Sequence, residues 1–263
     1  MTFILKFIIN LSALNRTIAL ISLKILKLLK KNRGYFNVQN NVMFLDFLDP
    51  IDRQIIIKQK YEEIELSILH KLTRNFDANY FIDIGANNGY YSIKFAEFYK
   101  DIRIIAFEPN NEAYLKFNKT LDINNKFSKR IILNNFGLSD KNSKEKMRSK
   151  VKYGYAQTGG STIHDGKKFN DIQIYEANFK IGDQVLNFKN SNLIIKIDVE
   201  SHEINVLRGL KNIIDCNNCI LQIEIFKENF EIINKFLLEN KFEKLNVEIN
   251  NSNHFYSKNF KKI

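Results

Sequence analysis

The segment Tyr80–Pro109, YFIDIGANNGYYSIKFAEFYKDIRIIAFEP, decides the fold class of this chain. It begins with an apolar run, Tyr80–Ile84, of the kind that forms buried strands. A glycine-containing turn and a helical pattern follow, and then a second apolar run, Ile102–Phe107, which ends at the acidic residue Glu108. Strand, glycine turn, helix, strand and acid in this order predict the mononucleotide-binding half of a doubly wound α/β sheet.

The glycine spacing bears on the ligand. The dinucleotide pattern G-x-G-x-x-G places its glycines where this chain has Gly85, Asn87 and Tyr90, so the glycine that lets a pyrophosphate lie against the backbone is missing. Asp83 lies two residues before Gly85, and its negative charge repels a diphosphate but suits an ammonium group. Glu108 is placed to accept hydrogen bonds from ribose hydroxyls. The segment therefore predicts a nucleoside that carries a cation, such as S-adenosylmethionine, and argues against NAD.

Length and composition favour one α/β domain with a short extension. The chain has 263 residues with only two prolines and ten glycines, which argues against a Pro/Gly-rich linker. We expect an N-terminal helical extension over residues 1–76 and a catalytic domain over residues 77–263. Further apolar runs at 131–134, 193–197 and 220–225 are typical of parallel strands covered on both faces.

Residues 141–192 interrupt the alternation of strands and helices. This segment contains Gly159-Gly160-Ser161-Thr162 and a strand-like run at 172–179. It is long for a simple connection, so we expect a β-ribbon insertion over the site, where substrate contacts are often found.

The net charge of +11 admits nucleic acid, anionic lipid or an acidic glycan as partners. The lysines are not interleaved with aromatic residues as on single-strand-binding surfaces, so we favour a solvated lysine-rich surface and expect no nucleic-acid partner. Cys216 and Cys219 form a C-x-x-C pair without a second pair. We interpret them as structural thiols, which indicates a reducing, cytoplasmic location.

Residues 1–33 combine apolar residues at helical spacing with interspersed lysines and arginines. No stretch of about eighteen residues is free of charge, which disfavours a spanning helix, and no cleavage site follows a clean apolar core. Two interpretations stay open: amphipathic helices that pack on the domain, and a basic amphipathic helix on a membrane surface. The same segment also suits a homodimer.

A second chemically dense stretch follows the run at 193–197. Four ionisable side chains occur there within six residues: Asp198, Glu200, His202 and Glu203. A strand-to-helix connection needs one capping residue, which Asp198 or Ser201 supplies. The unperturbed pKa of histidine, near 6.5, suits His202 to general base catalysis, with Asp198 or Glu200 orienting it or serving instead. A divalent metal is a further interpretation, but only Glu224 adds a carboxylate from the next strand, so we expect no metal.

Four sequence blocks resemble, in this order, the FkbM family of methyltransferases. They are F-I-D-I-G-A-N-x-G-Y-Y-S, A-F-E-P-N, L-S-D and I-K-I-D-V-E-x-H-E-x-x-V-L-x-G, and the resemblance covers residues 78–227. It implies a Rossmann-like class I methyltransferase, with a mostly parallel seven-stranded sheet, an antiparallel C-terminal strand and N-terminal helices. It also implies S-adenosylmethionine as cofactor and methyl transfer to a hydroxyl of a glycan, glycolipid or small natural product. The family usually has glycine where this chain has Ser201.

The resemblance also assigns roles to single residues. The implied cofactor residues are Asp83, Gly85, Asn87, Gly89, Glu108 and Asp140. Glu108 would hold the ribose and Asp140 would lie by the adenine, while Asp198, Glu200 and His202 match the family's acidic-histidine block. An NAD-dependent reductase is disfavoured because no Tyr-x-x-x-Lys pair is suitably placed. A membrane-peripheral or nucleic-acid-binding module with a vestigial nucleotide site is disfavoured by the intact acidic residues.

Overall fold

The computed structural model describes residues 28, 32–152, 155–164, 166, 170–247, 249 and 252–260. The two interpretations of residues 1–33, packing on the domain and lying on a membrane, concern residues that fall almost wholly outside these ranges. A helix suited to spanning a membrane is not found in the part of the chain that the structure describes.

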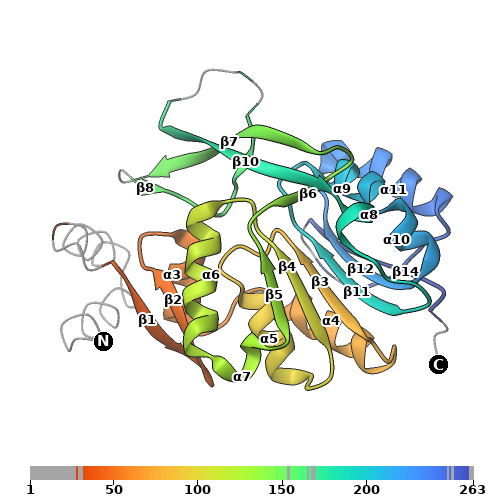
Figure 1. The fold of residues 1–263 in the computed structure, drawn as a ribbon, viewed down its shortest axis with the longest axis horizontal. Coiled ribbons are helices and arrows are strands. Elements are labelled where there is room, and N and C mark those ends of the chain that lie inside the picture. The colour runs from red at the N-terminus through yellow and green to blue at the C-terminus, as the bar shows by residue number, and fades with distance from the viewer. Residues whose placement is uncertain are drawn as a thin grey trace.

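A seven-stranded sheet within the described residues forms the centre of the molecule, in the order β13-β14-β12-β11-β3-β4-β5 (Figure 1). The strands are β3 (Tyr80–Ile84), β4 (Arg103–Phe107), β5 (Ile131–Asn134), β11 (Asn192–Ile197), β12 (Asn218–Glu224), β13 (Glu243–Lys244) and β14 (Asn253–Lys258). Strands β5, β4, β3, β11 and β12 are parallel, and β14 is antiparallel to β12. The predicted α/β fold with a mostly parallel sheet is confirmed.

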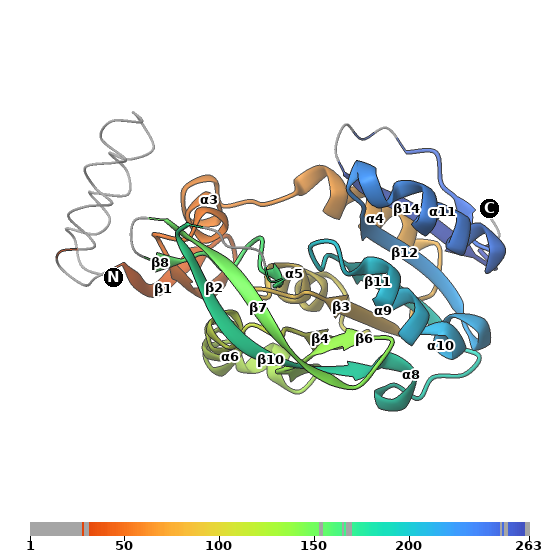
Figure 2. The same ribbon diagram turned by 90° about the horizontal axis from the view of Figure 1, so that it is seen from above.

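Helices cover both faces of this sheet because successive apolar residues of a strand face opposite sides. Phe81 of β3 packs in one core with α4 (Glu63–Arg74), α5 (Tyr90–Phe98), α6 (Asn111–Ile123) and α7 (Asn125–Ser128). Ile82 packs in a second core with α9 (Glu203–Gly209), α10 (Lys211–Cys216) and α11 (Phe230–Glu239). These last three helices lie together on one side in Figure 2, and the short helix η1 (Lys227–Asn229) precedes α11.

The described part of the N-terminal region corrects the expectation of a helical extension over residues 1–76. It begins with an antiparallel hairpin of β1 (Arg33–Val38) and β2 (Asn41–Asp46). Burial alternates along β1, with Phe36 and Val38 inside, which is the period of a strand and not of a helix. After the hairpin, the chain forms two separate helices, α3 (Pro50–Lys58) and α4. They are separate because Gln59 and Glu62 adopt left-handed backbone angles with φ of 58° and 45°.

A second sheet crosses one end of the central sheet (Figure 1). Its strands are β6 (Gly137–Ser139), β7 (Ser143–Lys152), β8 (Tyr155–Ala156), β9 (Thr162–Ile163) and β10 (Ile172–Ile181). The long strands β7 and β10 pair antiparallel from Ser143 opposite Phe179 to Lys150 opposite Ile172, and we call this pair the ribbon. A short helix, α8 (Gly182–Val185), leads from the ribbon toward β11.

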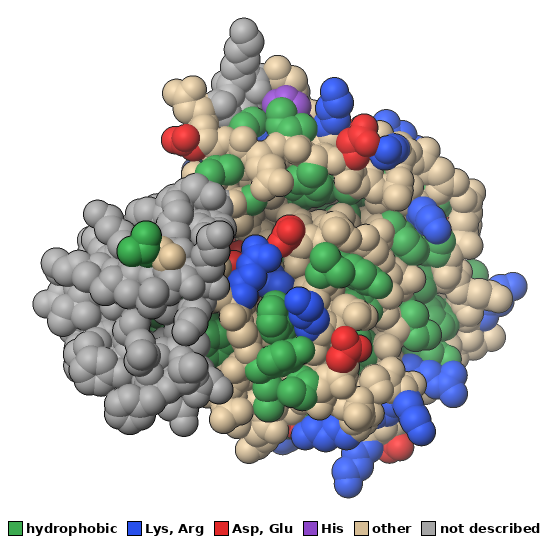
Figure 3. Space-filling view, turned by 60° about the vertical axis from the view of Figure 1, so that its left-hand side comes forward, with side chains coloured by type: hydrophobic (Ala, Val, Ile, Leu, Met, Phe, Trp, Pro, Cys, Tyr) green, Lys and Arg blue, Asp and Glu red, His purple; other side chains and the backbone are tan. Residues whose placement is uncertain are grey.

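The basic side chains are spread out on the face of the molecule shown in Figure 3. There, Lys and Arg side chains are intermixed with acidic and hydrophobic ones and do not form one continuous basic field. This distribution is that of a solvated lysine-rich surface, although the expectation of no nucleic-acid partner stays a prediction.

Candidate cofactor and catalytic site

A pocket lies at the carboxyl ends of the central strands, beneath the ribbon. Its walls include the glycine turn after β3, the acid after β4, the end of β11 and the residues that follow β11. From the ribbon side, Met147, Phe179 and the loop from Thr158 to Ser161 complete the wall. Ligands of doubly wound sheets bind at this edge, where the strands end in loops.

The glycine turn comes so close to its neighbours that two positions tolerate no side chain. Gly85 has a φ of 84°, and a Cβ built there would lie 1.9 Å from the carbonyl oxygen of Asp198. Gly89 has a φ of 81°, and its Cβ would lie 2.2 Å from the ring of Phe117. Asn87 between them also has a positive φ of 48°. Gly85 therefore presents bare backbone to the pocket, as close contact with a ligand requires, whereas Gly89 makes room for Phe117 and does not line the pocket.

Glu108 is buried at the end of β4 and holds the turn in place. Its Oε2 accepts a hydrogen bond from the backbone N–H of Asn87 at 2.7 Å, and its Oε1 accepts one from Asn110 at 2.7 Å. Burial raises the pKa of Glu108 to about 7, against the effect of these two hydrogen bonds. Each carboxylate oxygen keeps a lone pair, so the group can still accept hydrogen bonds from two ligand hydroxyls.

Asp83 lies at the floor of the pocket beside a buried cation. Its Oδ2 accepts a hydrogen bond from Ser92 Oγ at 2.6 Å, while Oδ1 is buried with no hydrogen-bond partner among the described residues. Burial raises the pKa of Asp83, and Lys196, its neighbour across the β3–β11 pair, opposes this shift. An ammonium donor would satisfy the orphaned oxygen.

Lys196 is a functional candidate that the sequence reasoning missed. Its Nζ lies 2.8 Å from Asp198 Oδ2 and 4.7 Å from the ring centre of Tyr91. Burial lowers the pKa of Lys196, but the charges of Asp198, Glu62 and Asp83 outweigh this and raise it, so the side chain stays charged. The available signal was a lysine within the otherwise apolar strand LIIKI, where a buried charge needs partners.

Three carboxylates meet at the ends of β11 and β12. Ligand atoms of Asp198, Glu200 and Glu224 all lie within 4.8 Å of one another. Burial and the charge of Asp198 raise the pKa of Glu224 to about 8, whereas the charge of Lys196, against burial, lowers the pKa of Asp198. At neutral pH Glu224 is therefore largely protonated and Asp198 is paired with a lysine. This charge state is poorer than three free carboxylates for a divalent ion, and the absence of a metal stays a prediction.

The turn after β11 brings Glu200 and His202 into the pocket. Glu200 and Ser201 have left-handed φ values of 51° and 75°, which explains why glycine is usual at the second position in the family that the sequence resembles. The Thr162 hydroxyl donates to the Glu200 carbonyl at 2.8 Å. Burial raises the pKa of Glu200, against a hydrogen bond that its carboxylate accepts from the Gly160 N–H.

His202 is held by two neighbours. Its Nε2 lies 2.9 Å from Ser139 Oγ, and its ring contacts the ring of Phe179 edge-on, with 5.5 Å between the centres. Burial lowers the pKa of His202, against the charges of Asp140 and Glu145. The imidazole is therefore neutral at pH 7 and able to accept a proton.

Two of the predicted cofactor residues, Gly89 and Asp140, do not line this pocket. Asp140 lies outside it because of its own contacts. Its carboxylate accepts hydrogen bonds from Asn205 Nδ2 at 3.0 Å and from Ser139 Oγ at 3.2 Å. The chain turns away after β5 because β6 joins the second sheet beside β10. The pocket wall in this stretch is formed instead by Gly137 and Leu138.

Comparison with models of known protein families identifies the family of this chain. A model of the FkbM methyltransferase domain matches residues 83–244, which is more than half of the chain. The chain belongs to the FkbM methyltransferase family. It is thus a methyltransferase with the class I Rossmann-like fold, and this fold generally uses S-adenosylmethionine.

Solved structures give weaker similarities to this FkbM methyltransferase. An FkbM methyltransferase from Methylobacillus flagellatus aligns at 14% identity and a TM-score of 0.49, over 69% of this chain and 44% of that one. A putative caffeoyl-CoA O-methyltransferase from Staphylococcus aureus aligns at 11% identity and 0.48, over 76% and 85%. A putative rRNA-methylase from Clostridium thermocellum aligns at 12% and 0.46, over 73% and 93%. No curated protein sequence matches this chain significantly.

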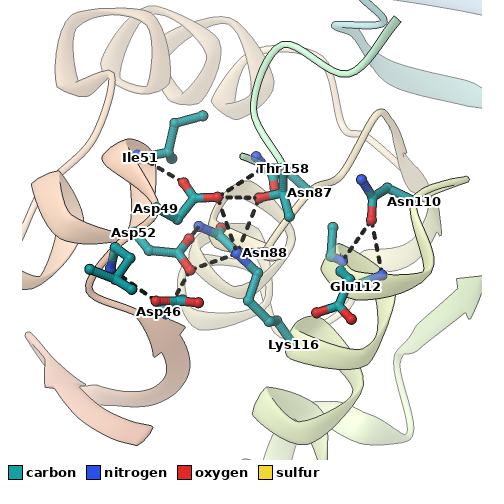
Figure 4. Close-up of polar contacts among 12 residues, drawn as sticks. Asp46, Asp49, Ile51, Asp52, Asn87, Asn88, Asn110, Glu112, Lys116 and Thr158 are labelled. Atoms are coloured by element: carbon teal, nitrogen blue, oxygen red, sulfur yellow. Dashed lines mark hydrogen bonds and ion pairs between the residues drawn. The ribbon is translucent and has the colours of Figure 1, made fainter. Parts of the chain in front are cut away.

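A buried polar network supports the glycine turn of this FkbM methyltransferase from behind (Figure 4). Lys116 Nζ of α6 lies 2.6 Å from Asp52 Oδ2 of α3, with exposed side-chain fractions of 4% and 0%. Asn88 Nδ2 of the turn donates to Asp52 Oδ1 at 2.6 Å. The hydroxyl of Thr158 lies 3.0 Å from Asn87 Oδ1 and 2.7 Å from Asp49 Oδ2. These contacts tie α3, the turn, α6 and the loop after β8 into one unit.

Sequence reasoning missed this network. The signal was three acids at three-residue spacing, Asp46, Asp49 and Asp52, within the largely apolar stretch MFLDFLDPIDRQII. Buried acids need cations and hydrogen-bond donors, but the partners are far away in the sequence.

Proposed function

We propose that this protein is an S-adenosylmethionine-dependent O-methyltransferase that acts on a hydroxyl of a glycan, glycolipid or small natural product. One observation carries the proposal: a single pocket joins a glycine turn held by Glu108 at one end to the Glu200–His202 turn at the other. The first end has a backbone turn and a carboxyl group that can bind a nucleoside, and the second has side chains that can take a proton from a hydroxyl nucleophile.

The cofactor end fits a ligand with a ribose and a positive charge. Gly85 lets the backbone approach the ligand, and Glu108 has free lone pairs for the ribose hydroxyls. The orphaned Oδ1 of Asp83 would accept a hydrogen bond from the α-ammonium group. Glu62 and Asp198 line the same pocket, where the carboxyl groups outnumber Lys196, and this excess of acids favours a cation. The cofactor would supply a methyl group on a positively charged sulfur.

At the acceptor end, the protein has to align the hydroxyl oxygen with the methyl carbon and take up the hydroxyl proton. We assign proton uptake to His202, because its lowered pKa keeps the imidazole neutral. Ser139 fixes the ring orientation through Nε2. Glu200 is the second candidate base, since its raised pKa makes it more basic than an ordinary carboxylate. Replacing His202 with Ala separates the two: lost transfer with intact cofactor binding supports His202, whereas unchanged turnover assigns the step to Glu200.

Binding of S-adenosylmethionine tests the proposal directly. At a cofactor concentration of 100 times Kd, ligand binding stabilises a folded protein by about 2.7 kcal/mol, which corresponds to a rise in Tm of about 5–10 °C for a chain of this size. We expect this rise with S-adenosylmethionine or its demethylated product, no rise with NADH, and no loss of it after treatment with EDTA. A folded protein whose Tm does not respond to millimolar cofactor contradicts the proposal. Removal of the shift by EDTA, with recovery on adding Mg²⁺, contradicts the absence of a metal.

A further inference from the structure

A second cavity opens beside the cofactor pocket, and we call it the outer cavity. Arg148 and Lys150 of β7, Thr162 of β9 and Ile172 of β10 line it. The outer cavity shares four lining residues with the cofactor pocket, namely Gly160, Ile163, Glu200 and His202. A molecule in the outer cavity thus reaches the two candidate bases without contact with the glycine turn, which does not line this cavity.

The strand period explains why two cations line this cavity. Lys144, Lys146, Arg148 and Lys150 alternate along β7 and therefore share one face, whereas Met147 and Ser149 between them are buried on the other. The register with β10 places Glu176 opposite Lys146, but Ile174 opposite Arg148 and Ile172 opposite Lys150. On the β10 side the cross-strand neighbours of the two cavity cations are thus apolar, and on the β9 side Arg148 lies opposite Thr162.

The two cavities differ in their balance of charge, since Arg148 and Lys150 outnumber the single acid Glu200 in the outer cavity. The cofactor pocket contains Asp83, Glu108 and Asp198, and its buried cation Lys196 is engaged with Asp198. In the outer cavity the charge of Lys150 is felt by Glu200, whose pKa it lowers against the effect of burial. An anion is repelled from the first site and attracted to the second, so charge alone would orient a molecule with an anionic end and a hydroxyl end.

We propose that the methyl acceptor carries an oxyanion, a phosphoryl or carboxylate group, which binds Arg148 and Lys150 while the acceptor hydroxyl faces His202 and Glu200. Arginine suits this role because its planar fork matches the two oxygens of either group. The inference rests on the proposed methyltransferase function. In the reaction, the bond from sulfur to the methyl carbon breaks, the bond from the hydroxyl oxygen to that carbon forms, and the proton goes to the base.

Probe binding tests the proposal on the full chain saturated with S-adenosylhomocysteine. The probes are glycerol 1-phosphate, glycerate and neutral glycerol. Their binding is measured by isothermal titration calorimetry at low salt. We expect at least one charged probe to bind and glycerol not to bind. The double variant R148Q/K150Q should weaken that binding about tenfold, as the loss of hydrogen bonds to a charged group implies. The matched control K144Q/K146Q, which removes the same charge from the same face of β7 outside the cavity, should change it less than about twofold.

Other outcomes overturn the proposal. If neither charged probe binds more tightly than glycerol, the outer cavity does not select an oxyanion, and an equal loss in both double variants shows only general attraction to positive charge. The single variant K150Q, at an exposed position, replaces R148Q/K150Q if the latter does not fold. A separate experiment uses vesicles of phosphatidylglycerol and vesicles of phosphatidylcholine. If the protein binds only the phosphatidylglycerol vesicles, and K150Q abolishes this binding, the oxyanion belongs to a lipid headgroup. Failure to bind S-adenosylhomocysteine itself contradicts the proposed function, and is distinct from failure to bind the probes.

Discussion

Glu108 combines two tasks in one carboxyl group. It fixes the glycine turn and the start of α6 through the N–H groups of Asn87 and Asn110, and it is our candidate for the ribose acceptor. A group that is already held by the protein loses little freedom when a ligand arrives, which favours binding. Its protonation state then decides how well it accepts hydrogen bonds from hydroxyls.

The pH dependence of the protein follows from its buried acids. Burial raises the pKa of Asp52 to about 6, of Glu108 to about 7 and of Glu224 to about 8. The folded state therefore binds more protons than the unfolded state, and the free energy of unfolding without cofactor should fall as pH rises from about 5 to 8. The affinity for cationic S-adenosylmethionine should rise over the same range, because ionised acids accept hydrogen bonds and attract the cation.

Urea unfolding and calorimetric titration at several pH values measure both trends. In the variant Glu108→Gln we expect weaker cofactor binding with a flatter pH profile, whereas Glu112→Gln, which alters an exposed side chain in the first turn of α6, should leave both unchanged. A cofactor affinity that falls between pH 6 and 8 contradicts the proposed role of the acids.

The close approach of the glycine turn to its neighbours is tested at Gly85, with Gly166, which lies outside the turn, as the control. Both have a positive φ, 84° and 79°, but a Cβ at Gly85 meets the Asp198 carbonyl at 1.9 Å, and a Cβ at Gly166 meets nothing within 4 Å. Gly166→Ala should cost about 1–2 kcal/mol of unfolding free energy from backbone strain alone. Gly85→Ala should cost about 4 kcal/mol or more, because a clash with backbone is added. If the two variants lose the same unfolding free energy in urea, the backbone moves to remove the contact with the Asp198 carbonyl at no cost.

At the level of elements, helix α6 depends on one buried lysine. Lys116 neutralises Asp52 and lies 3.6 Å from Asp49, and all three side chains are buried. Replacing Lys116 with Met leaves two buried acids without their cation, and we expect a loss of about 3–5 kcal/mol. Lys119→Met, an exposed position one turn further along α6, should cost less than about 1 kcal/mol. Thermal or urea unfolding measures the free energy of unfolding of both variants. Similar small losses in the two would mean that Asp49 and Asp52 become protonated when Lys116 is absent.

The elements differ in how far the sequence determines them. The strand, turn and helix at residues 80–109 depend on local patterns and were predictable, as were the parallel strands at 131–134, 193–197 and 220–225. The break between α3 and α4 was not, because left-handed backbone at Gln59 and Glu62 has no glycine to signal it. The buried network was not predictable either, since Asp52 and Lys116 are 64 residues apart and Thr158 and Asp49 are 109 apart.

Asp140 shows the same limit within the site. Its position after a central strand indicated the cofactor edge of the sheet, and β5 does end there. The pairing of β6 with β10 then carries the side chain to Asn205, and no local pattern in the sequence reports that pairing. Lys196, in contrast, was visible as a charge within an apolar strand and was overlooked.

On the scale of the whole molecule, the N-terminal hairpin shares a core with the catalytic domain. Phe36, Met43 and Leu45 belong to the same hydrophobic cluster as Phe95 and Phe117 of α5 and α6. The hairpin is therefore integral to the fold, and a domain boundary at residue 76 does not divide the core.

The membrane interpretation of residues 1–33 is tested by a deletion that respects this core. Removal of residues 1–31 leaves β1 intact, and under the membrane interpretation it should keep the Tm within about 2 °C, because that interpretation places the apolar face of the segment in lipid. If the segment is the membrane anchor, binding to anionic vesicles in a sedimentation assay should fall to the background level, because the amphipathic surface is gone. Undiminished vesicle binding rejects the membrane interpretation, and a change of mass in solution would support a homodimer instead.

The contact between Thr158 and Asp49 has a consequence for protein engineering. The backbone N–H and the hydroxyl of Thr158 both donate to the same Asp49 oxygen, at 2.9 Å and 2.7 Å, and the hydroxyl also touches Asn87 of the glycine turn. A chimaera that receives its ribbon from another family member acquires a foreign residue opposite Asp49. The transplantable unit is therefore discontinuous: the ribbon with its loop, together with the start of α3. Acceptor preference should pass between relatives only when both pieces are exchanged.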